Sequence, residues 1–234
     1  MINTKDKNKY KTLTQKQLNK VFINSCQKGH LEIVQYLLTS PDLKEHANIQ
    51  AQDDLGFRLA CEKGNLEVVK YLLTSPDLKE HADIHADNDS GFRWACFDGH
   101  LEIVKYLLTS PDLKEHANIH ADNDNGFRLA CANIHLEVVK YLLTSPNLKE
   151  HADIHADNDY GFIWACSRGH LEIVKYLILD MSIEKTKHIE KYLNKKTDNK
   201  TVQQAIELFN TRDLHHQLNE NIKDNKEQAK KRKL

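Results

Sequence analysis

The sequence predicts an all-α solenoid of stacked helix pairs, with hairpin-like loops between the pairs and a helical cap at the C-terminal end. All five cysteines recur at a spacing of 35 residues, and all four prolines recur at the same spacing. Before each proline lies a run of apolar residues at helical spacing. A unit of this length cannot bury its apolar face alone, whereas stacked copies bury it against one another.

The first helix of each unit is expected where an aspartate precedes a partly apolar segment. In the third copy, Asp89 stands before GFRWACFD at residues 91–98. Aspartate is a favoured N-cap, because its carboxylate accepts a hydrogen bond from a backbone N–H of the first turn. Arg93 follows Asp89 by four residues, which predicts an ion pair within the helix worth about 0.3 kcal/mol. The aspartate recurs in other copies as Asp54, Asp124 and Asp159.

The second helix is expected after a turn glycine, over residues 101–110 in the same copy. We expect the histidine that follows this glycine, His100, to help cap the second helix. Ser110-Pro111 then predicts a short extra turn, and the Asx-rich segment HANIHADND predicts an extended return to the next unit. In the fourth copy Ile134 replaces the glycine. Because a β-branched residue disfavours positive φ, we expect that turn to be altered or strained.

The ends of the chain lack the repeat, and this divides the chain into four segments. We expect a basic N-terminal capping segment over residues 1–20, about five repeats over 21–180, a helical C-terminal cap over 181–225 and a basic flexible tail over 226–234. Near the N-terminus, Thr14 and Gln17 fit a capping box that opens a polar helix. Near the C-terminus, helices are expected over residues 183–195, 201–210 and 213–223.

Charge is spread unevenly along the chain. Residues 1–20 carry a net charge of +5, residues 21–180 carry −11 and residues 181–234 carry +5. Nucleic-acid affinity depends on basic side chains that neutralise phosphates, so we expect no nucleic-acid ligand, with contact through the basic ends as the alternative. The sequence contains neither a span of about 20 apolar residues nor a secretory signal, so we expect no membrane association and a cytoplasmic location. The segment Lys230-Lys231-Arg232-Lys233 resembles a nuclear-import signal and offers the nucleus as an alternative.

The five cysteines and fourteen histidines raise the question of metal binding. Packed helices lie about 8–10 Å apart, which is too far for a disulfide between equivalent cysteines, and no Cys-x-x-Cys pair is present. We therefore interpret the cysteines as small buried thiols in a reducing compartment, with a metal or redox site as the alternative. Pairs such as His85 and Asp87 offer too few ligands for a closed metal site. We expect no metal and no cofactor.

Several segments are similar to the ankyrin repeat. The helix sequence GHLEIVKYLL, the turn that begins at Ala82 and the small pair Ala95-Cys96 recur, with variants, over residues 20–180. This resemblance implies an ankyrin-type repeat solenoid with a concave face that binds proteins. The chain departs from the family pattern in two ways. Ser90-Gly91-Phe92-Arg93 stands in place of Thr-Pro-Leu-His, and the unit has 35 residues against about 33 in the usual repeat.

Comparison of the copies predicts where a partner binds. At about 100° per residue, Phe92, Ala95 and Cys96 share one face of the first helix, and this face hardly changes between copies. The opposite positions diverge, and both tryptophans fall among them. Exposed apolar groups rimmed by polar ones are typical of interaction sites, and Trp and Tyr are frequent hot-spot residues. We name these positions the helix A stripe: Gln27, Lys28, Leu55, Leu59, Glu62, Lys63, Ser90, Trp94, Phe97, Asp98, Asn125, Leu129, Ala132, Asn133, Tyr160, Trp164, Ser167 and Arg168.

The function that we expect is non-enzymatic binding of a partner protein, of unknown identity, on the helix A stripe and the adjacent loops. The protein would act as a monomeric adaptor or effector, with Trp94, Phe97, Tyr160 and Trp164 as anchors. The alternative for the tryptophans is sideways packing against the neighbouring loop. The sequence contains no nucleophile elbow, phosphate-binding glycine loop or His-Glu-x-x-His helix, so we expect no small-molecule substrate. A separate activity of the C-terminal helices is the alternative function.

Overall fold

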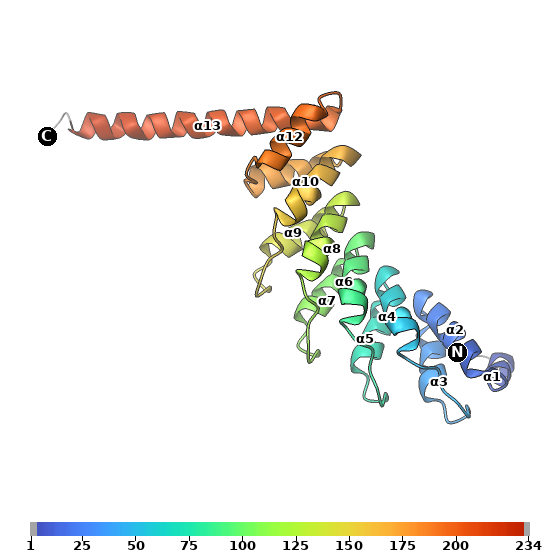
Figure 1. Ribbon diagram of the computed structural model, residues 1–234. Coiled ribbons are helices and arrows are strands. Elements are labelled where there is room, and N and C mark those ends of the chain that lie inside the picture. Colours follow the sequence, from blue (N-terminus) through green and yellow to red (C-terminus); the bar gives the residue numbers. More distant parts are fainter. Residues whose placement is uncertain (1–3, 232–234) are drawn as a thin grey trace.

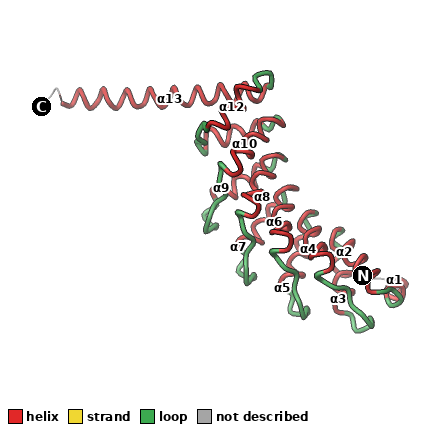
Figure 2. Tube along the Cα trace, in the orientation of Figure 1, coloured by secondary structure: helices red, strands yellow, loops and turns green. Residues whose placement is uncertain are grey.

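The structure is a computed structural model that describes residues 4–231, with side chains described over residues 7–220, 222 and 223. Helix pairs follow one another along a curved stack, and the two ends of the chain lie at opposite ends of it (Figure 1). The loops that connect successive pairs project on one side of the stack (Figure 2). No strand occurs among residues 4–231. The predicted all-α solenoid of helix pairs is confirmed.

Each repeat contributes a first helix and a shorter second helix. The first helices are α2 (Gln15–Gln27), α4 (Ala51–Glu62), α6 (Ala86–Asp98), α8 (Ala121–Ala132) and α10 (Ala156–Arg168). The second helices are α3 (Leu31–Thr39), α5 (Leu66–Thr74), α7 (Leu101–Thr109), α9 (Leu136–Thr144) and α11 (Leu171–Lys175), which continues as the π-helical turn η1 (Tyr176–Asp180). The helix α1 (Thr4–Tyr10) precedes the pairs, and α12 (Lys187–Lys195) and α13 (Lys200–Lys231) follow them.

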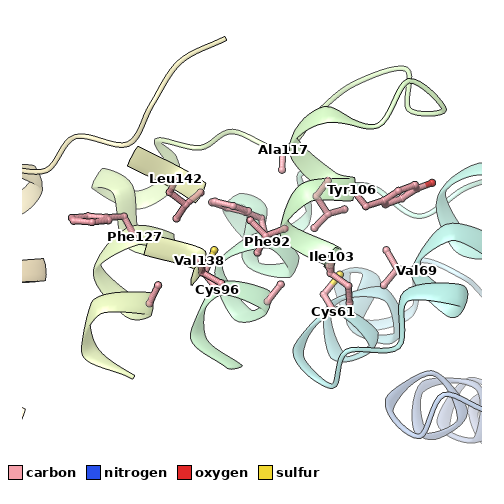
Figure 3. Close-up of a cluster of buried hydrophobic side chains, with 14 of the residues drawn as sticks. Cys61, Val69, Phe92, Cys96, Ile103, Tyr106, Ala117, Phe127, Val138 and Leu142 are labelled. Atoms are coloured by element: carbon pink, nitrogen blue, oxygen red, sulfur yellow. The ribbon is translucent and has the colours of Figure 1, made fainter. Parts of the chain in front are cut away.

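The first helices pack against one another through the invariant phenylalanine, alanine and cysteine of each unit. Phe92, Ala95 and Cys96 are fully buried, and Figure 3 places Phe92 and Cys96 within a row of buried side chains that continues into the neighbouring units. Gly91 is required by this packing, because a Cβ atom there would lie 2.7 Å from Cε1 of Phe57 in the preceding unit. The predicted inner face of the first helices is confirmed.

A left-handed turn precedes the right-handed part of each first helix, and the sequence did not predict it. Asp87, Asn88 and Asp89 have φ values of 52°, 55° and 56°, a conformation that Asp and Asn adopt more readily than most residues. The predicted N-cap role of Asp89 is wrong, because its carboxylate accepts a hydrogen bond from the backbone N–H of Asn118 in the next unit, at 2.9 Å. Equivalent contacts are made by Asp54 and Asp124.

The predicted ion pair between Asp89 and Arg93 is also wrong. Arg93 donates from Nε to the carbonyl of Asn88 at 2.9 Å and from Nη2 to that of Asp87 at 2.8 Å. Its Nη1 lies 3.5 Å from a carboxylate oxygen of Asp122 in the next unit. The guanidinium group therefore binds the carbonyls of the left-handed turn and joins two units. The equivalent ion pairs are Arg58 with Asp87 at 2.7 Å and Arg128 with Asp157 at 2.6 Å.

The turn between the two helices of a unit has the same backbone conformation with glycine or with isoleucine. Gly99 has a φ of 77° and Ile134 a φ of 68°, so the expected strain at Ile134 is confirmed, since β-branched residues rarely adopt positive φ. His100 is the N-cap residue of the second helix, as expected, but its side chain makes no capping hydrogen bond. Its Nε2 donates to the carbonyl of Glu62, at the end of the preceding unit's first helix, at 2.8 Å.

The ends of the stack are closed by helices, as expected, although one boundary differs. The capping box at α2 is confirmed, with the Thr14 N–H donating to Oε1 of Gln17 at 2.9 Å. The two helices predicted over residues 201–210 and 213–223 form the single helix α13, because no residue between them breaks the helix. This helix runs to Lys231 and therefore enters the segment expected to be a flexible tail, of which residues 232–234 lie outside the described residues.

Candidate interaction surface

The helix A stripe lies along the row of first helices, α2, α4, α6, α8 and α10 (Figure 1). All but two of its members reach the surface. The exposed members are Lys28, Lys63, Phe97, Tyr160, Ser167 and Arg168. The half-buried members are Gln27, Leu55, Leu59, Glu62, Trp94, Asp98, Asn125, Leu129, Asn133 and Trp164. The stripe is therefore continuous across the units, although most of its side chains are partly covered.

Ser90 and Ala132 are buried, so the expectation that they face a partner is wrong. Ser90 is fully buried, and its Oγ lies 3.5 Å from Nη1 of Arg58 in the preceding unit. Ala132 is 2% exposed, and its carbonyl accepts hydrogen bonds from Arg168 and His170 of the next unit. In both cases a neighbouring unit covers the residue, and a helical wheel drawn for one helix does not include that neighbour.

Trp94 stands on the surface of the stripe and also packs sideways. Its indole ring is half-buried, and the guanidinium carbon of Arg58 lies 5.3 Å from the ring centre. Arg58 belongs to the preceding unit and is itself buried against the left-handed turn. One face of the indole ring thus contacts the preceding unit. The sequence offered two interpretations of Trp94, exposure on a binding surface and sideways packing, and each describes part of its environment.

Trp164 belongs to an aromatic cluster in the last unit. The ring of Tyr160 meets it edge-on, with ring centres 5.5 Å apart, and the guanidinium carbon of Arg168 lies 6.0 Å from its ring centre. Tyr160 is 41% exposed, whereas Trp164 is half-buried. The cluster therefore presents two aromatic rings and one cation at the same place on the stripe.

Ile134 adds an apolar group that the sequence comparison missed. It is 63% exposed and Phe97 is 43% exposed. His135, the neighbour of Ile134 in sequence, donates from Nε2 to the carbonyl of Phe97 at 2.8 Å, which ties the turn of Ile134 to the preceding unit. The replacement of a turn glycine was visible in the sequence, but we interpreted it as a backbone irregularity rather than as part of the surface.

Polar side chains on the stripe connect neighbouring units. Nζ of Lys63 lies 2.6 Å from a carboxylate oxygen of Glu62 and 3.5 Å from one of Asp98 in the next unit. The hydrogen bond with Glu62 raises the pKa of the Lys63 ammonium group. Arg168 donates to the side-chain carbonyl of Asn133 at 3.3 Å. Lys63 and Arg168 are exposed, whereas Glu62 and Asp98 are half-buried. Ion pairs this close to water contribute little to stability.

The cysteines lie in the core rather than on the stripe. All five are buried, unpaired thiols, and burial raises their pKa values well above the ordinary range. A buried neutral thiol is a poor nucleophile and a poor metal ligand. Within the part of the chain that the structure describes, no group of three or more His, Cys, Asp or Glu side chains is placed to hold a metal ion.

The histidines of the loops bind the buried aspartates. Nδ1 of His85 donates to the carboxylate of Asp89 at 2.9 Å, and its Nε2 lies 3.5 Å from Glu115 of the next unit. The second unit has Gln50 where the later units have this histidine. Its buried Asp54 lacks the imidazole partner, and burial raises the pKa of the Asp54 carboxyl from its usual value of 3.8 to about 6.

Open cavities recur between the loops of neighbouring units. Three equivalent cavities have volumes of about 290, 380 and 530 Å³. Each is lined by the same residue types, for example Thr109, His116 and Lys149 in one of them. Because the cavities repeat with the units, none is distinguished as a site for a small molecule.

Comparison with models of known families identifies the kind of repeat and the residues that form it. A family model described as ankyrin repeats (3 copies) matches residues 22–123, 57–158, 92–189 and 127–211, in overlapping registers that together span most of the chain. The search of curated proteins returned no match. Over the described residues, none of the helices combines the length and the apolar character that crossing a membrane requires.

Proposed function

This chain belongs to the ankyrin repeat family, and we propose that it binds one partner protein on the helix A stripe. Ankyrin repeats are generally protein–protein interaction modules and are typically not enzymes. The stripe is the part of each unit that has diverged, while the inner face has not. A surface whose residues differ between otherwise similar units fits recognition of one extended partner.

The observation that carries this proposal is the exposure of large apolar side chains at diverged positions. Phe97 and Tyr160 are 43% and 41% exposed, and the indole rings of Trp94 and Trp164 are half-buried beside them. Large aromatic groups that remain exposed in the free protein favour a site where a partner covers them. The charged rim formed by Lys63, Asp98 and Arg168 supplies orientation rather than affinity.

We propose that the protein acts as an adaptor or effector in a reducing compartment, the cytoplasm, where its five free thiols are stable. Repeated contacts between units hold the stack together, and the helix A stripe is the one surface that differs between the units. This combination favours a role in binding another protein.

The test compares partner capture by three forms of the full chain. The stripe variant carries Phe97→Ala and Tyr160→Ala, and the control carries Glu102→Ala and Glu172→Ala, which change exposed residues of the second helices α7 and α11. Proteins captured by the unchanged chain and the control, but not by the stripe variant, are expected. Capture of the same proteins by all three forms, with equal melting temperatures, would remove the stripe as the binding site.

A further inference from the structure

The helix α13 consists of two parts with different surroundings. Its first part packs on the last repeat, where Val202, Ala205 and Phe209 are fully buried. The contact ends at Arg212, which donates from Nη1 to the carbonyl of Ile183 at 2.8 Å. Beyond Arg212 the helix projects away from the stack to Lys231 (Figure 1), a length of about 28 Å at 1.5 Å per residue.

The projecting part carries an uncovered apolar strip. Leu214, Leu218 and Ile222 are 55%, 52% and 50% exposed, and they follow one another at a spacing of four residues, which places them on one face. At about 100° per residue, Phe209 lies on the opposite face from Leu218. The strip therefore does not continue the face that packs on the repeats, and it points away from the protein's own core.

The projecting part of α13 would be stabilised by a partner that covers its apolar strip. Isolated helices of this length are marginal in water even with good helix formers, and residues 213–225 include three asparagines. Apolar side chains in one row add a hydrophobic cost as long as water covers them. A second amphipathic helix laid along the strip relieves both problems, since it covers the leucines and stabilises the helix.

We propose that the projecting part of α13 pairs with the same segment of a second copy of this chain, antiparallel and centred on Leu218. The distribution of charge along α13 favours antiparallel over parallel pairing of the two helices. Residues 207–224 carry four carboxylates and two basic groups, whereas residues 226–233 carry five basic groups and one carboxylate. Parallel helices bring the two basic segments together, whereas antiparallel helices centred on Leu218 place the two basic segments at opposite ends of the helix pair.

The register that centres on Leu218 also pairs individual side chains. Leu214 then faces Ile222 of the second copy, so the two apolar strips cover each other. Asp213 lies level with Lys223 of the second copy, and His216 lies level with Glu220. A parallel pair sets Asp213 against Asp213 and Glu220 against Glu220, and like charges side by side are destabilising.

A dimer of this kind replaces the monomer expected from the sequence and places a repeat stack at each end of the helix pair. The helix A stripe lies on the repeats and stays uncovered in both copies. Two stripes joined in one particle bind a partner that has two sites more tightly than one stripe does, because the second contact becomes intramolecular. The dimer does not depend on the proposed function of the stripe, and it can be tested without any partner.

The first test measures the mass of the full chain in solution by light scattering at a series of concentrations. The unchanged chain is expected at twice its mass of 27.1 kDa. Leu218→Glu is expected to raise the dissociation constant at least about 100-fold, because it buries an unpaired carboxylate. The matched control, Gln217→Glu, adds the same charge one residue away and should remain a dimer. A monomeric unchanged chain, or a dimer that Leu218→Glu leaves intact, overturns the proposal.

The second test uses single introduced cysteines to determine whether the two helices are parallel or antiparallel. The five natural thiols are buried, so they do not form disulfides with the introduced ones. Leu214→Cys and Ile222→Cys are each expected to form no disulfide alone, whereas an equal mixture of the two variants forms a cross-linked dimer. Cross-linking of either variant alone indicates parallel helices and overturns the antiparallel arrangement. A monomer that floats with vesicles of phosphatidylcholine and phosphatidylserine assigns the strip to a membrane surface instead and also overturns it.

Discussion

The third and fourth units of the stack have the same inner face and different outer faces. Phe92 and Phe127 occupy equivalent buried positions, whereas the turn residue is Gly99 in one unit and Ile134 in the other, with nearly the same φ. The next unit fixes the inner residue, because the phenylalanine and the cysteine of one unit both pack against the glycine of the next unit. The turn residue is less enclosed: Ile134 is 63% exposed, although a Cβ atom at Gly99 would meet the ring of His135 in the next unit. Its identity therefore differs between the two units while the backbone φ hardly changes.

The largest loss of stability is expected when the buried phenylalanine of the inner face is removed from either unit. Phe92→Ala and Phe127→Ala should each lower the free energy of unfolding by about 3–5 kcal/mol, because each leaves a cavity at a fully packed site. The two losses should agree within about 1 kcal/mol if the inner faces are equivalent. Urea unfolding followed by circular dichroism measures both. A loss in one unit less than half that in the other would contradict the equivalence.

A smaller effect is expected from exchanging the two turn residues. Gly99→Ile should destabilise the protein by about 1–2 kcal/mol, since it forces a β-branched residue to positive φ and its Cβ would clash with the ring of His135. Ile134→Gly should stabilise it by about 1 kcal/mol, because it removes the strain that the fourth unit already carries. Melting temperatures of the two variants should therefore move in opposite directions. A loss of stability in Ile134→Gly would mean that this side chain is held by contacts.

The sequence predicts the inner face and the helix pairs because both depend on local pattern and on a period that is repeated five times. It does not predict the pairing of polar groups between units. Asp89 and Arg93 are four residues apart, and we interpreted this as a pair within one helix. Their partners are Asn118 and Asp122, each 29 residues further along the chain. No local pattern distinguishes these contacts from the helical ones.

The same limit applies to the candidate surface. The helical wheel placed Phe97 and Tyr160 at the surface, and both are well exposed, whereas Trp94 and Trp164 are half-buried. It failed for Ser90 and Ala132, because the residues that cover them come from another unit. The length of α13 was missed for a related reason: the polar segment around Asn210 resembles a break, yet the helix continues through it.

The second and third units also differ at a titratable site, which gives a prediction on pH. The folded protein binds a proton at Asp54 more readily than the unfolded chain, because burial raises the pKa of this carboxyl from 3.8 to about 6. Ionised Asp54 therefore weakens folding above pH 6, and this penalty fades as the pH falls from 6 towards 4. Asp54→Asn should be more stable than the unchanged chain at pH 7.5, with the difference vanishing near pH 4.

The control for this prediction is Asp89→Asn in the third unit. That carboxylate has His85 as a partner, so its replacement should bring no gain at pH 7.5. Denaturation midpoints measured from pH 4 to pH 8 compare the two variants. Parallel profiles for the Asp54 variant and the unchanged chain would show that this carboxyl does not titrate differently on folding.

The smallest effect on stability is expected at the outer position that distinguishes the third unit from the fourth. Phe97→Ala gives the third unit the alanine that the fourth unit has as Ala132, and it should change the free energy of unfolding by less than about 0.5 kcal/mol, since an exposed ring has few contacts to lose. The reverse change, Ala132→Phe, should cost about 1–3 kcal/mol, because Ala132 is 2% exposed and has no room for a ring. If both expectations hold, the ring at Phe97 is retained for something other than folding. A loss of 2 kcal/mol or more in Phe97→Ala would instead make this ring part of the scaffold and remove it from the proposed binding surface.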